Sequence, residues 1–456
     1  MVKTEQQQAN VQLVEPVVVV GLGKTGLSVA RFLSAQGLDY KVVDSRDIPP
    51  GLQELKEFVQ DKNIVTGEFK SELFDSAKTL IVSPGISIQH PLIKAATDRG
   101  AAVIGDIELF ARLANAPVVA ITGSNGKSTV TTLLAQMASD AGQNVKVGGN
   151  LGVPALDLLD ESAELYVLEL SSFQLETTFS LDAVVSVILN ISEDHMDRYD
   201  SLQDYAAAKA KVFNGQGTII ANLDDEIVMR LVDESGLQRH HISFGMKLPF
   251  ENNYGVCPQA GETWLCKGQQ LLLPINKLGI KGTHNVSNAL AALALGEAIE
   301  LPMESMLQTL PVFTGLEHRT QWVAECHGVN WFNDSKATNV GATVAAIEGL
   351  PGEHIILIAG GQGKGQDFSP LSIALKNRVS HVILIGEDAR LINVIVPETI
   401  ETIFADDMKQ AVTQAANYAK AGDAVLLSPA CASFDMFTGY EHRGNVFIEA
   451  VRELCA

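Results

Sequence analysis

The sequence predicts an α/β fold in three domains, each built around a mainly parallel sheet. At 456 residues the chain can hold about three domains of ~100–200 residues each. Short apolar strands expected at 16–20, 117–121 and 354–359 each run directly into a glycine-rich turn. Between them, apolar strands alternate with helical patterns, at 40–44, 79–82, 165–168, 183–189, 218–221, 381–385 and 424–427. Such alternation is typical of parallel sheets with crossover helices.

Domain boundaries are expected near Gly105 and Gly315, which divides the chain into 1–105, 106–315 and 316–456. The polar, glutamine-rich stretch 1–16 has no apolar core of signal-peptide length and is expected to be a loose leader. No apolar run approaches the ~18–20 residues of a membrane span. We therefore expect no membrane partner.

Charge and cysteine content limit the possible binding partners and the cellular compartment. Lys and Arg total 33 against 54 Asp and Glu, a formal net charge of −21. This balance argues against nucleic-acid binding, which needs a basic face. The five cysteines are scattered, and none has zinc-ligand spacing. They are expected to be ordinary reduced thiols of a cytoplasmic protein.

The turn after the strand at 117–121 predicts a nucleoside-triphosphate site. Its residues are Gly123, Ser124, Asn125, Gly126, Lys127, Ser128 and Thr129. Backbone N–H groups of such a turn, together with the start of the following helix, bind phosphate oxygens. Lys127 can reach the outer phosphates, and Ser128 or Thr129 can bind Mg²⁺. Only two residues separate Gly123 from Gly126, where the standard phosphate-binding loop has four between its first Gly and the Gly-Lys pair.

The first glycine-rich turn, Gly21-x-Gly23-x-x-Gly26, resembles a dinucleotide fingerprint. Asp44 ends the next strand, about 20 residues on, where a ribose-binding carboxylate is usual. Alone, this pattern would indicate NAD and an oxidoreductase. The same turn can also hold another nucleotide diphosphate, and we favour that interpretation beside an ATP motif.

Further polar residues lie where predicted strands end or helices begin. Glu169 ends a strand at the edge where open α/β sheets bind ligands, and its carboxylate suits Mg²⁺. His195 follows the strand at 183–189 and could bind a metal or a phosphate, although a lone histidine is more often structural. Lys209 lies in an alanine-rich helix. Asn288 could contact a nucleobase, and a mobile third domain could bring Arg319 and Asp334 onto the nucleotide.

Taken in order, these motifs resemble the Mur ligase family, whose cytoplasmic members add amino acids to a UDP-linked muramic acid in peptidoglycan synthesis. The resemblance extends from Gly21 to about Gly444, and the short phosphate turn is the family's own variant. The segments 169–176 (ELSSFQLE), 194–199 (DHMDRY) and 428–435 (SPACASFD) are similar to those of the members that add D-glutamate.

The resemblance implies a Rossmann-like N-terminal domain for the UDP-linked substrate, a central P-loop-type ATPase domain and a Rossmann-like C-terminal domain for the amino acid. ATP would phosphorylate the carboxylate of UDP-N-acetylmuramoyl-L-alanine, and the amine of D-glutamate would attack the acyl phosphate. Mg²⁺ at two sites is implied as cofactor. We expect a monomer, because no oligomerisation element is visible.

The resemblance also assigns roles to single residues. The catalytic group comprises Lys127, Glu169, His195 and Lys209, and the metal ligands are Ser128, Glu169, His195 and Lys209, the last as a carbamate. The ATP-binding residues are those of the phosphate turn, Gly123 to Thr129, with Asn288, Arg319 and Asp334. The UDP-linked substrate is assigned to Thr25, Ser45, Arg46, Ser83, Asn150 and Gln174. D-glutamate is assigned to Thr338, Lys364, Ser433 and Tyr440.

Three positions depart from the family pattern: Lys24 stands where an apolar residue is expected, Ser45 replaces a threonine, and Tyr440 replaces a phenylalanine. None of them belongs to the phosphate turn. Three alternatives remain open at this point: another Mur-type or folylpolyglutamate-type amino-acid ligase, an NAD-dependent oxidoreductase, and a non-catalytic ATP-gated binding module.

Overall fold

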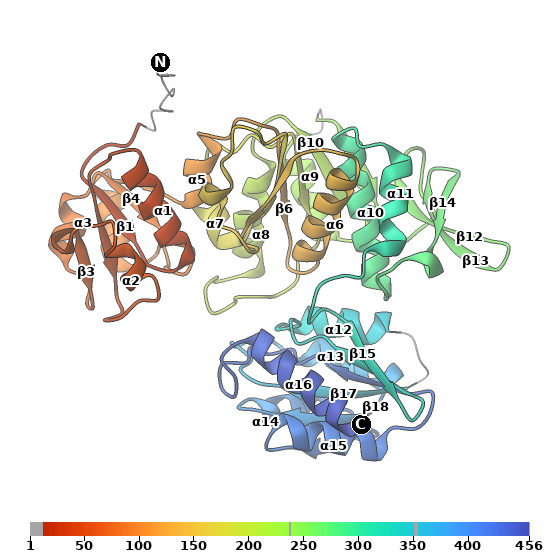
Figure 1. Ribbon diagram of the computed structural model, residues 1–456. Helices are drawn as coiled ribbons and strands as arrows, with labels where there is room; N and C mark the ends of the chain where they lie inside the picture. Colours follow the sequence, from red (N-terminus) through yellow and green to blue (C-terminus); the bar gives the residue numbers. More distant parts are fainter. Residues whose placement is uncertain (1–11, 237–238, 351–353, 456) are drawn as a thin grey trace.

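A computed structural model of the chain describes residues 12–236, 239–350 and 354–455. These residues form three sheets in three successive parts of the chain, which we call the N-terminal, central and C-terminal units (Figure 1). The mixed α/β class predicted from the sequence is confirmed. Residues 1–11 of the expected leader lie outside the described residues. Within the described part, no helix is long and apolar enough to cross a membrane.

The N-terminal unit has a five-stranded sheet in the order β3-β2-β1-β4-β5, with all neighbours parallel. The strand β1 is buried along its whole length, because helices cover both faces of this parallel sheet. Its elements are β1 (Val17–Val20), α1 (Lys24–Ala35), β2 (Tyr40–Asp44), α2 (Leu52–Leu55), η1 (Asp61–Asn63), β3 (Ile64–Thr66), α3 (Ser71–Ser76), β4 (Thr79–Val82), α4 (Pro91–Asp98) and β5 (Ala102–Ile104).

The turn between β1 and α1 depends on two glycines. Gly21 has φ +97°, in the left-handed region. A Cβ at Gly26 would lie 1.8 Å from Gly21 O, so only glycine allows the helix to approach the strand this closely. The turn is fixed from β2 by Asp44, whose Oδ2 accepts a hydrogen bond from Leu22 N at 2.7 Å.

The central unit has a nine-stranded sheet in the order β14-β13-β12-β11-β10-β9-β6-β8-β7. Neighbours are parallel from β7 through to β12, and the pairings of β12 with β13 and of β13 with β14 at one edge are antiparallel. Its elements are α5 (Asp106–Ala111), β6 (Val118–Thr122), α6 (Lys127–Asp140), β7 (Val145–Gly149), η2 (Ala155–Leu158), β8 (Leu165–Glu169), α7 (Ser172–Glu176), β9 (Val185–Ile188), α8 (Leu202–Ala210), η3 (Lys211–Phe213), β10 (Thr218–Asn222), α9 (Glu226–Glu234), β11 (His241–Phe244), β12 (Tyr254–Gln259), β13 (Glu262–Lys267), β14 (Gln270–Pro274), η4 (Ile275–Lys277), α10 (Thr283–Ala298) and α11 (Met303–Val312).

Strand order in the central sheet brings the functional segments together. β6 lies between β8 and β9, parallel to both. The carboxyl ends of these strands therefore meet at one edge of the sheet, which is where open α/β sheets bind ligands. On one face, α6 and α10 pack on side chains of β6 such as Ile121. The other face packs against the side of α5 and α8.

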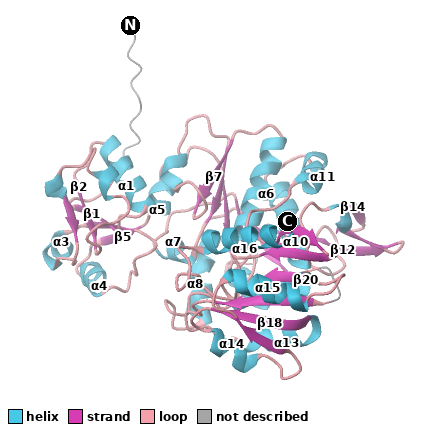
Figure 2. Cartoon of the chain, turned by 60° about the horizontal axis from the view of Figure 1, so that its bottom comes forward, coloured by secondary structure: helices cyan, strands magenta, loops and turns pink. Residues whose placement is uncertain are grey.

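The C-terminal unit has a six-stranded sheet in the order β15-β16-β20-β17-β18-β19, with only β15 antiparallel to its neighbour. Figure 2 shows α15 and α16 on one face of this sheet and α13 and α14 on the other, in agreement with its two apolar clusters. Its elements are β15 (Gln321–Cys326), β16 (Val329–Asn333), α12 (Val340–Gly349), β17 (Ile355–Gly360), α13 (Ser369–Arg378), β18 (Val379–Ile385), α14 (Ala389–Ile395), β19 (Glu401–Phe404), α15 (Met408–Tyr418), β20 (Ala424–Leu427) and α16 (Tyr440–Cys455).

The two junctions between the units differ in character. One continuous apolar cluster runs from the N-terminal sheet through α1 and α5 into the central sheet. Polar contacts reinforce it: Asp157 accepts hydrogen bonds from Ser28 Oγ at 2.8 Å and from an Arg31 nitrogen at 2.7 Å. Among the described residues, no apolar cluster joins the central and C-terminal units. The contacts described below for that junction are hydrogen bonds and ion pairs.

The cysteines differ from the expectation of separate thiols. Cys257 and Cys266 lie on adjacent strands of the β12–β13 hairpin with their sulfurs in contact, and Cys326 and Cys455 are likewise paired between β15 and α16. Their Cα–Cα distances are 6.1 Å and 5.5 Å. Scattered sequence positions did not reveal these pairs because strand register and helix packing bring them together. Cys431 is buried and free.

The close approach at the first turn gives a test of this local packing. Gly26→Ala should lower the free energy of unfolding by about 1–3 kcal/mol, because the new methyl group overlaps Gly21 O. Gly23→Ala is the matched control: its φ is −92° and a Cβ there meets nothing within 4 Å, so its effect should stay within about 0.5 kcal/mol. Urea unfolding of both variants measures this. Equal stability of the two would contradict the packing argument.

Candidate functional site

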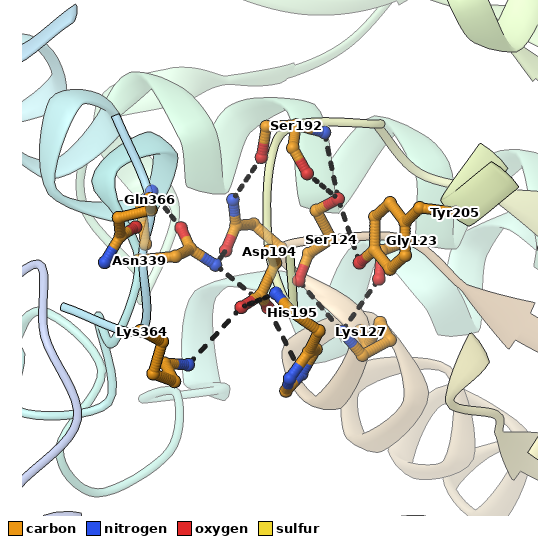
Figure 3. A network of polar contacts seen from close by, with 12 residues as sticks. Gly123, Ser124, Lys127, Ser192, Asp194, His195, Tyr205, Asn339, Lys364 and Gln366 are labelled. Carbon is orange, nitrogen blue, oxygen red and sulfur yellow. Dashed lines mark hydrogen bonds and ion pairs between the residues drawn. The ribbon is translucent and has the colours of Figure 1, made fainter. Parts of the chain in front are cut away.

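The phosphate turn joins β6 to α6, as the motif predicts. Gly126 caps α6 with φ +83°, and the first turn of the helix carries no acidic residue. Lys127 Nζ donates to Gly123 O at 2.7 Å and to Ser124 O at 2.8 Å, so its ammonium lies folded over the turn (Figure 3). Burial lowers the pKa of Lys127. A partly buried lysine beside the positive end of a helix is an anion-binding arrangement.

Lys209, on α8, reaches the same turn from the other side. It is 1% exposed, and its Nζ donates to Gly123 O at 2.9 Å and to Thr122 Oγ1 at 3.3 Å. Burial lowers the pKa of Lys209 well below its usual value, and the nearby charge of Lys127 adds to this effect. The amine therefore has a strong tendency to be neutral, the form that can act as a nucleophile.

Ser128 and Glu169 form the core of a candidate metal site. Ser128 Oγ donates to Glu169 Oε2 at 2.5 Å, and Asn150 Nδ2 donates to Glu169 Oε1 at 2.6 Å. Arg319, from the segment leading into the C-terminal unit, donates to Ser128 Oγ at 2.7 Å. A hydroxyl and a buried carboxylate at the end of a strand are oxygen ligands of the kind Mg²⁺ prefers, so these residues fit the ion.

The other two expected metal ligands are not in contact with that pair. Lys209 is held by the turn carbonyl, and His195 packs edge-on against the Phe173 ring. Its Nε2 lies 3.6 Å from an oxygen of Asp194. Burial lowers the pKa of His195, so the imidazole is neutral near pH 7. Over the described residues, no group of three His, Cys, Asp or Glu side chains forms a ready metal cluster.

Asp194 stands at the junction of the central and C-terminal units. Its Oδ1 lies 3.5 Å from Lys364 Nζ, and its Oδ2 accepts a hydrogen bond from Asn339 Nδ2 at 3.3 Å (Figure 3). Burial alone would raise the pKa of Asp194, but His195 and Lys364, both protonated at the low pH where a carboxyl group titrates, hold it below its usual value. The carboxylate is therefore ionised and links both units.

A cavity of about 980 Å³ runs from the first glycine-rich turn to the metal-site residues. It is large enough for a nucleotide-linked substrate. Ser128, Glu169, Arg319 and Tyr440 line the cavity. All six residues predicted to bind the UDP-linked substrate line it as well: Thr25, Ser45, Arg46, Ser83, Asn150 and Gln174. One continuous cavity thus joins sequence positions that lie far apart.

Inside this cavity, Asp44 does not have the free carboxylate that an NAD ribose requires. Its Oδ1 accepts hydrogen bonds from Arg46 N and Nε, and its Oδ2 is bound by Leu22 N and Arg46 Nη2. The guanidinium of Arg46 is half-exposed beside the start of α1. This geometry favours a phosphate-rich ligand over a nicotinamide dinucleotide.

A second cavity, of about 320 Å³, lies between the phosphate turn, α10 and α12. The predicted ATP-binding residues Asn288, Arg319 and Asp334 line it together with Asn125, Gly126 and Thr129. Burial raises the pKa of Asp334 to about 7, while its Oδ2 accepts a hydrogen bond from Ser428 Oγ at 2.8 Å. Both the central and the C-terminal units therefore contribute to this pocket.

The residues predicted for D-glutamate fall into separate places. Lys364 pairs with Asp194, whereas Tyr440 lies at the end of the first cavity with Lys336 Nζ 3.8 Å from its ring centroid. Thr338 precedes α12, and Ser433 is buried in the loop before α16. No side-chain contact among the described residues joins these four directly.

Sequence reasoning missed four residues of this region. Lys336 lines both cavities, and Asp194 and Asn339 bridge the units. Arg443 is 1% exposed and donates to the carbonyl oxygens of Ser335, Cys431 and Ala432, which fixes the loops around the site. Asp194 lies beside His195, and Lys336 and Asn339 lie in the same segment as Asp334 and Thr338, so their neighbours in sequence were the available signal. Arg443 resembles an ordinary surface residue in sequence.

Sequence models of three domain families match this chain in order. The Mur ligase MurD-like N-terminal domain matches residues 15–105, the Mur ligase middle domain 121–296, and the Mur ligase glutamate ligase domain 318–431.

Two curated relatives are similar over nearly the full length. The UDP-N-acetylmuramoylalanine–D-glutamate ligase of Nitrosococcus oceani is 52% identical over 97% of this chain and 98% of its own length. The ligase of the same name from Pseudomonas aeruginosa is 49% identical over 96% of this chain and 98% of its own.

Solved structures share the fold. UDP-N-acetylmuramate–alanine ligase MurC from Thermotoga maritima has a TM-score of 0.60 at 18% identity, over 96% of this chain and 99% of that one. MurF from Acinetobacter baumannii has a TM-score of 0.59 at 17% identity, over 95% and 90%.

The missed lysine gives a test of the site's electrostatics. Burial lowers the pKa of Lys336 to about 8, against about 10.4 in an unfolded chain. Below about pH 8 both states are protonated and the folded state carries the full cost of burying the charge. As the pH rises further the folded state loses its proton first, so wild-type stability should increase. Lys336→Met should therefore be the more stable protein at about pH 7, by roughly 1–3 kcal/mol, and this advantage should shrink towards about pH 10.

Urea unfolding at both pH values measures the difference between Lys336→Met and the wild type. Lys409→Met, at an exposed lysine, is the control, and its difference from the wild type should not shrink in the same way. A gain for Lys336→Met that is equal at both pH values would indicate improved packing rather than removal of a buried charge.

Proposed function

The chain belongs to the Mur ligase family, and from that premise we propose that it is the ATP-dependent ligase that adds D-glutamate to UDP-N-acetylmuramoyl-L-alanine in peptidoglycan precursor synthesis. The observation that carries this proposal is the similarity, at about half of all positions and over nearly the whole chain, to relatives that bear that activity in their name. The cavity that joins the first glycine-rich turn to Ser128 and Glu169 supports it.

The proposed reaction proceeds in two steps. A carboxylate oxygen of the L-alanine attacks the γ-phosphorus of ATP, which forms an acyl phosphate and releases ADP. The amine of D-glutamate then attacks the acyl carbon, the amide bond forms, and inorganic phosphate leaves with loss of a proton from the nitrogen. A free carboxylate is a poor acyl donor, so the phosphoryl group supplies the leaving group. The protein needs to orient the reactants and to stabilise negative charge rather than to supply its own nucleophile.

We infer that the triphosphate lies on the turn Gly123 to Thr129, at the positive end of α6. Lys127 would exchange its two carbonyl acceptors for phosphate oxygens. Asn288 and Asp334 would contact the base and the ribose in the second cavity, and Arg319 would neutralise a phosphate.

Mg²⁺, when bound, neutralises phosphate charge and orients the phosphoryl group. Ser128 and Glu169 fit a first position, and His195 and Lys209 would complete a second. For that role Lys209 needs an anionic form: its neutral amine adds to the carbon of CO₂, forms an N–C bond and loses one proton, which gives a carbamate. The buried amine described above is suited to this step.

The remaining assignments follow the two cavities. Thr25, Ser45, Arg46 and Ser83 would hold the uridine diphosphate, and Asn150 and Gln174 the sugar or its peptide. Thr338, Lys364, Ser433 and Tyr440 would bind D-glutamate, with Lys364 supplying the charge for a carboxylate. We place the domain boundaries at 105/106 and 315/316. We infer a cytoplasmic protein because ATP and nucleotide-linked precursors are cytoplasmic substrates, and a monomer because the sequence shows no obvious oligomerisation element.

Amino-acid selectivity tests the proposed function. The purified protein with UDP-N-acetylmuramoyl-L-alanine, ATP and Mg²⁺ should release ADP when D-glutamate is added, and at least about tenfold more slowly with L-glutamate or lysine, because only the correct amine reaches the acyl phosphate in an attacking geometry. A coupled ADP assay gives the rates. Omitting the UDP-linked substrate is the control for background ATP hydrolysis. ADP release with a folate acceptor instead would move the chain to the folylpolyglutamate-type ligases.

Removal of the strand-end carboxylate tests the metal assignment. Glu169→Gln should raise the Mg²⁺ concentration for half-maximal activity and lower kcat by about 100-fold or more, because a neutral amide is a weaker ligand for a hard cation. A Mg²⁺ titration of ADP release measures both effects. Glu164→Gln, an exposed glutamate just before β8, is the control. An unchanged Mg²⁺ response in Glu169→Gln would remove this residue from the proposed ligands.

A further inference from the structure

Asn339 occupies a buried position at the junction of the central and C-terminal units. It caps α12: its Oδ1 accepts a hydrogen bond from Ala342 N at 2.8 Å. A backbone N–H can only donate, so the oxygen must face the helix and the amide nitrogen must face away from it. Only 4% of the residue is exposed. The orientation of the amide is therefore fixed by its own helix.

Both hydrogens of the Asn339 amide cross to the central unit. Nδ2 donates to Asn125 Oδ1 at 3.2 Å. It also donates to Asp194 Oδ2 at 3.3 Å (Figure 3). Asp194 Oδ2 accepts from the same nitrogen, which agrees with the orientation set by the helix. One side chain thus satisfies all its polar atoms and joins three segments.

The two acceptors belong to different parts of the site. Asn125 lies in the phosphate turn, where its backbone N donates to Asn190 Oδ1 at 2.8 Å. Asp194 pairs with Lys364, which is itself in the C-terminal unit. Asn339 also follows Thr338 directly. The amide therefore connects the phosphate turn to the two side chains expected to meet the amino acid.

We propose that Asn339 is a positioning residue that sets the C-terminal unit against the phosphate turn, so that Lys364 and Thr338 face the incoming amino acid. This inference rests on the proposed function, and it names a group that does not touch the reacting atoms. The role requires one acceptor for the helix and two donors for the junction. No other side chain of this length provides the acceptor and the two donors together. Aspartate keeps the acceptor for the helix cap but has no donors, and alanine has neither the acceptor nor the donors.

Asn339→Asp separates the two parts of this role. The helix cap is kept, but the junction loses both donors and gains a carboxylate beside Asp194. We expect the KM for D-glutamate to rise at least about tenfold, since a like charge replaces a hydrogen bond at a buried position. The KM for the UDP-linked substrate should stay within about twofold, because the six residues predicted to bind it all belong to the N-terminal and central units. A general loss of structure would instead alter both values.

A matched variant controls for loss of a helix cap in the same unit. Asp407 caps α15 by accepting from Gln410 N at 2.8 Å. Asn339→Ala and Asp407→Ala each remove one cap, but only the first should raise the KM for D-glutamate. This pair also decides the question if Asn339→Asp is recovered unfolded. Equal KM values for the two alanine variants would overturn the proposal.

A swap tests whether Asn339 acts through Asp194. In the double variant Asn339→Asp with Asp194→Asn, the new amide at position 194 can donate to the new carboxylate at position 339, which restores one bridge. The KM for D-glutamate of the double variant should lie at least about threefold below the product of the single effects. Single effects that simply multiply would overturn the proposal.

Wild-type turnover, measured in the same assay, keeps the two claims apart. An inactive wild type with D-glutamate would remove the proposed function and this inference with it. An active wild type whose KM for D-glutamate is matched by Asn339→Asp within about twofold would overturn the inference alone.

Discussion

A cluster of basic side chains without a carboxylate partner is the constraint on which this site depends. The chain carries a formal net charge of −21, yet Lys127, Lys209, Arg319 and Lys336 lie together at the edge of the central sheet, and burial lowers the pKa of each of them. No described ion pair within 4.0 Å neutralises any of the four. Carbonyl or hydroxyl oxygens accept hydrogen bonds from Lys127, Lys209 and Arg319 instead. Lys336 Nζ lies over the Tyr440 ring. Removing such a cluster from water raises the free energy of the folded state, and binding of an anionic ligand offsets that increase. A nucleoside triphosphate has the required negative charge.

The two junctions between the units differ in how readily they can open. The N-terminal and central units share one apolar cluster, and separating them would expose it to water. The central and C-terminal units meet through Asn339, Asp194, Lys364 and Arg319, whose polar groups can exchange partners with water at small net cost. The first pair of units therefore forms a firm platform for the nucleotide-linked substrate. The second junction is the one suited to opening and closing around ATP and an amino acid.

The sequence predicted those parts of the structure that local pattern determines. β2, β4 and β20 have the bounds expected from their apolar runs, and the glycine-rich turns lead into helices as predicted. The short strands β3 and β5 were missed because three residues give little periodicity, and so was the β12–β14 edge, where exposed residues interrupt the apolar pattern. Strand order could not be predicted, since it depends on how distant segments pack. In the site, the motif residues Ser128 and Glu169 lie in hydrogen-bond contact at the edge of the central sheet. Asn339 was missed because an asparagine before a helix is an ordinary cap, and only the fold reveals its second set of contacts.

The carbonyl oxygen of Gly123 links two lysines, because it accepts hydrogen bonds from both Lys127 and Lys209. One peptide group is thus shared by the side chain that would bind the triphosphate and the side chain that would carry the carbamate. When Lys127 leaves that oxygen for a phosphate, Lys209 becomes its only side-chain donor. When Lys209 is converted to a carbamate and no longer donates to that oxygen, Lys127 becomes its side-chain donor. Nucleotide binding and the chemical state of Lys209 are therefore linked thermodynamically: each must alter the equilibrium of the other by the same factor.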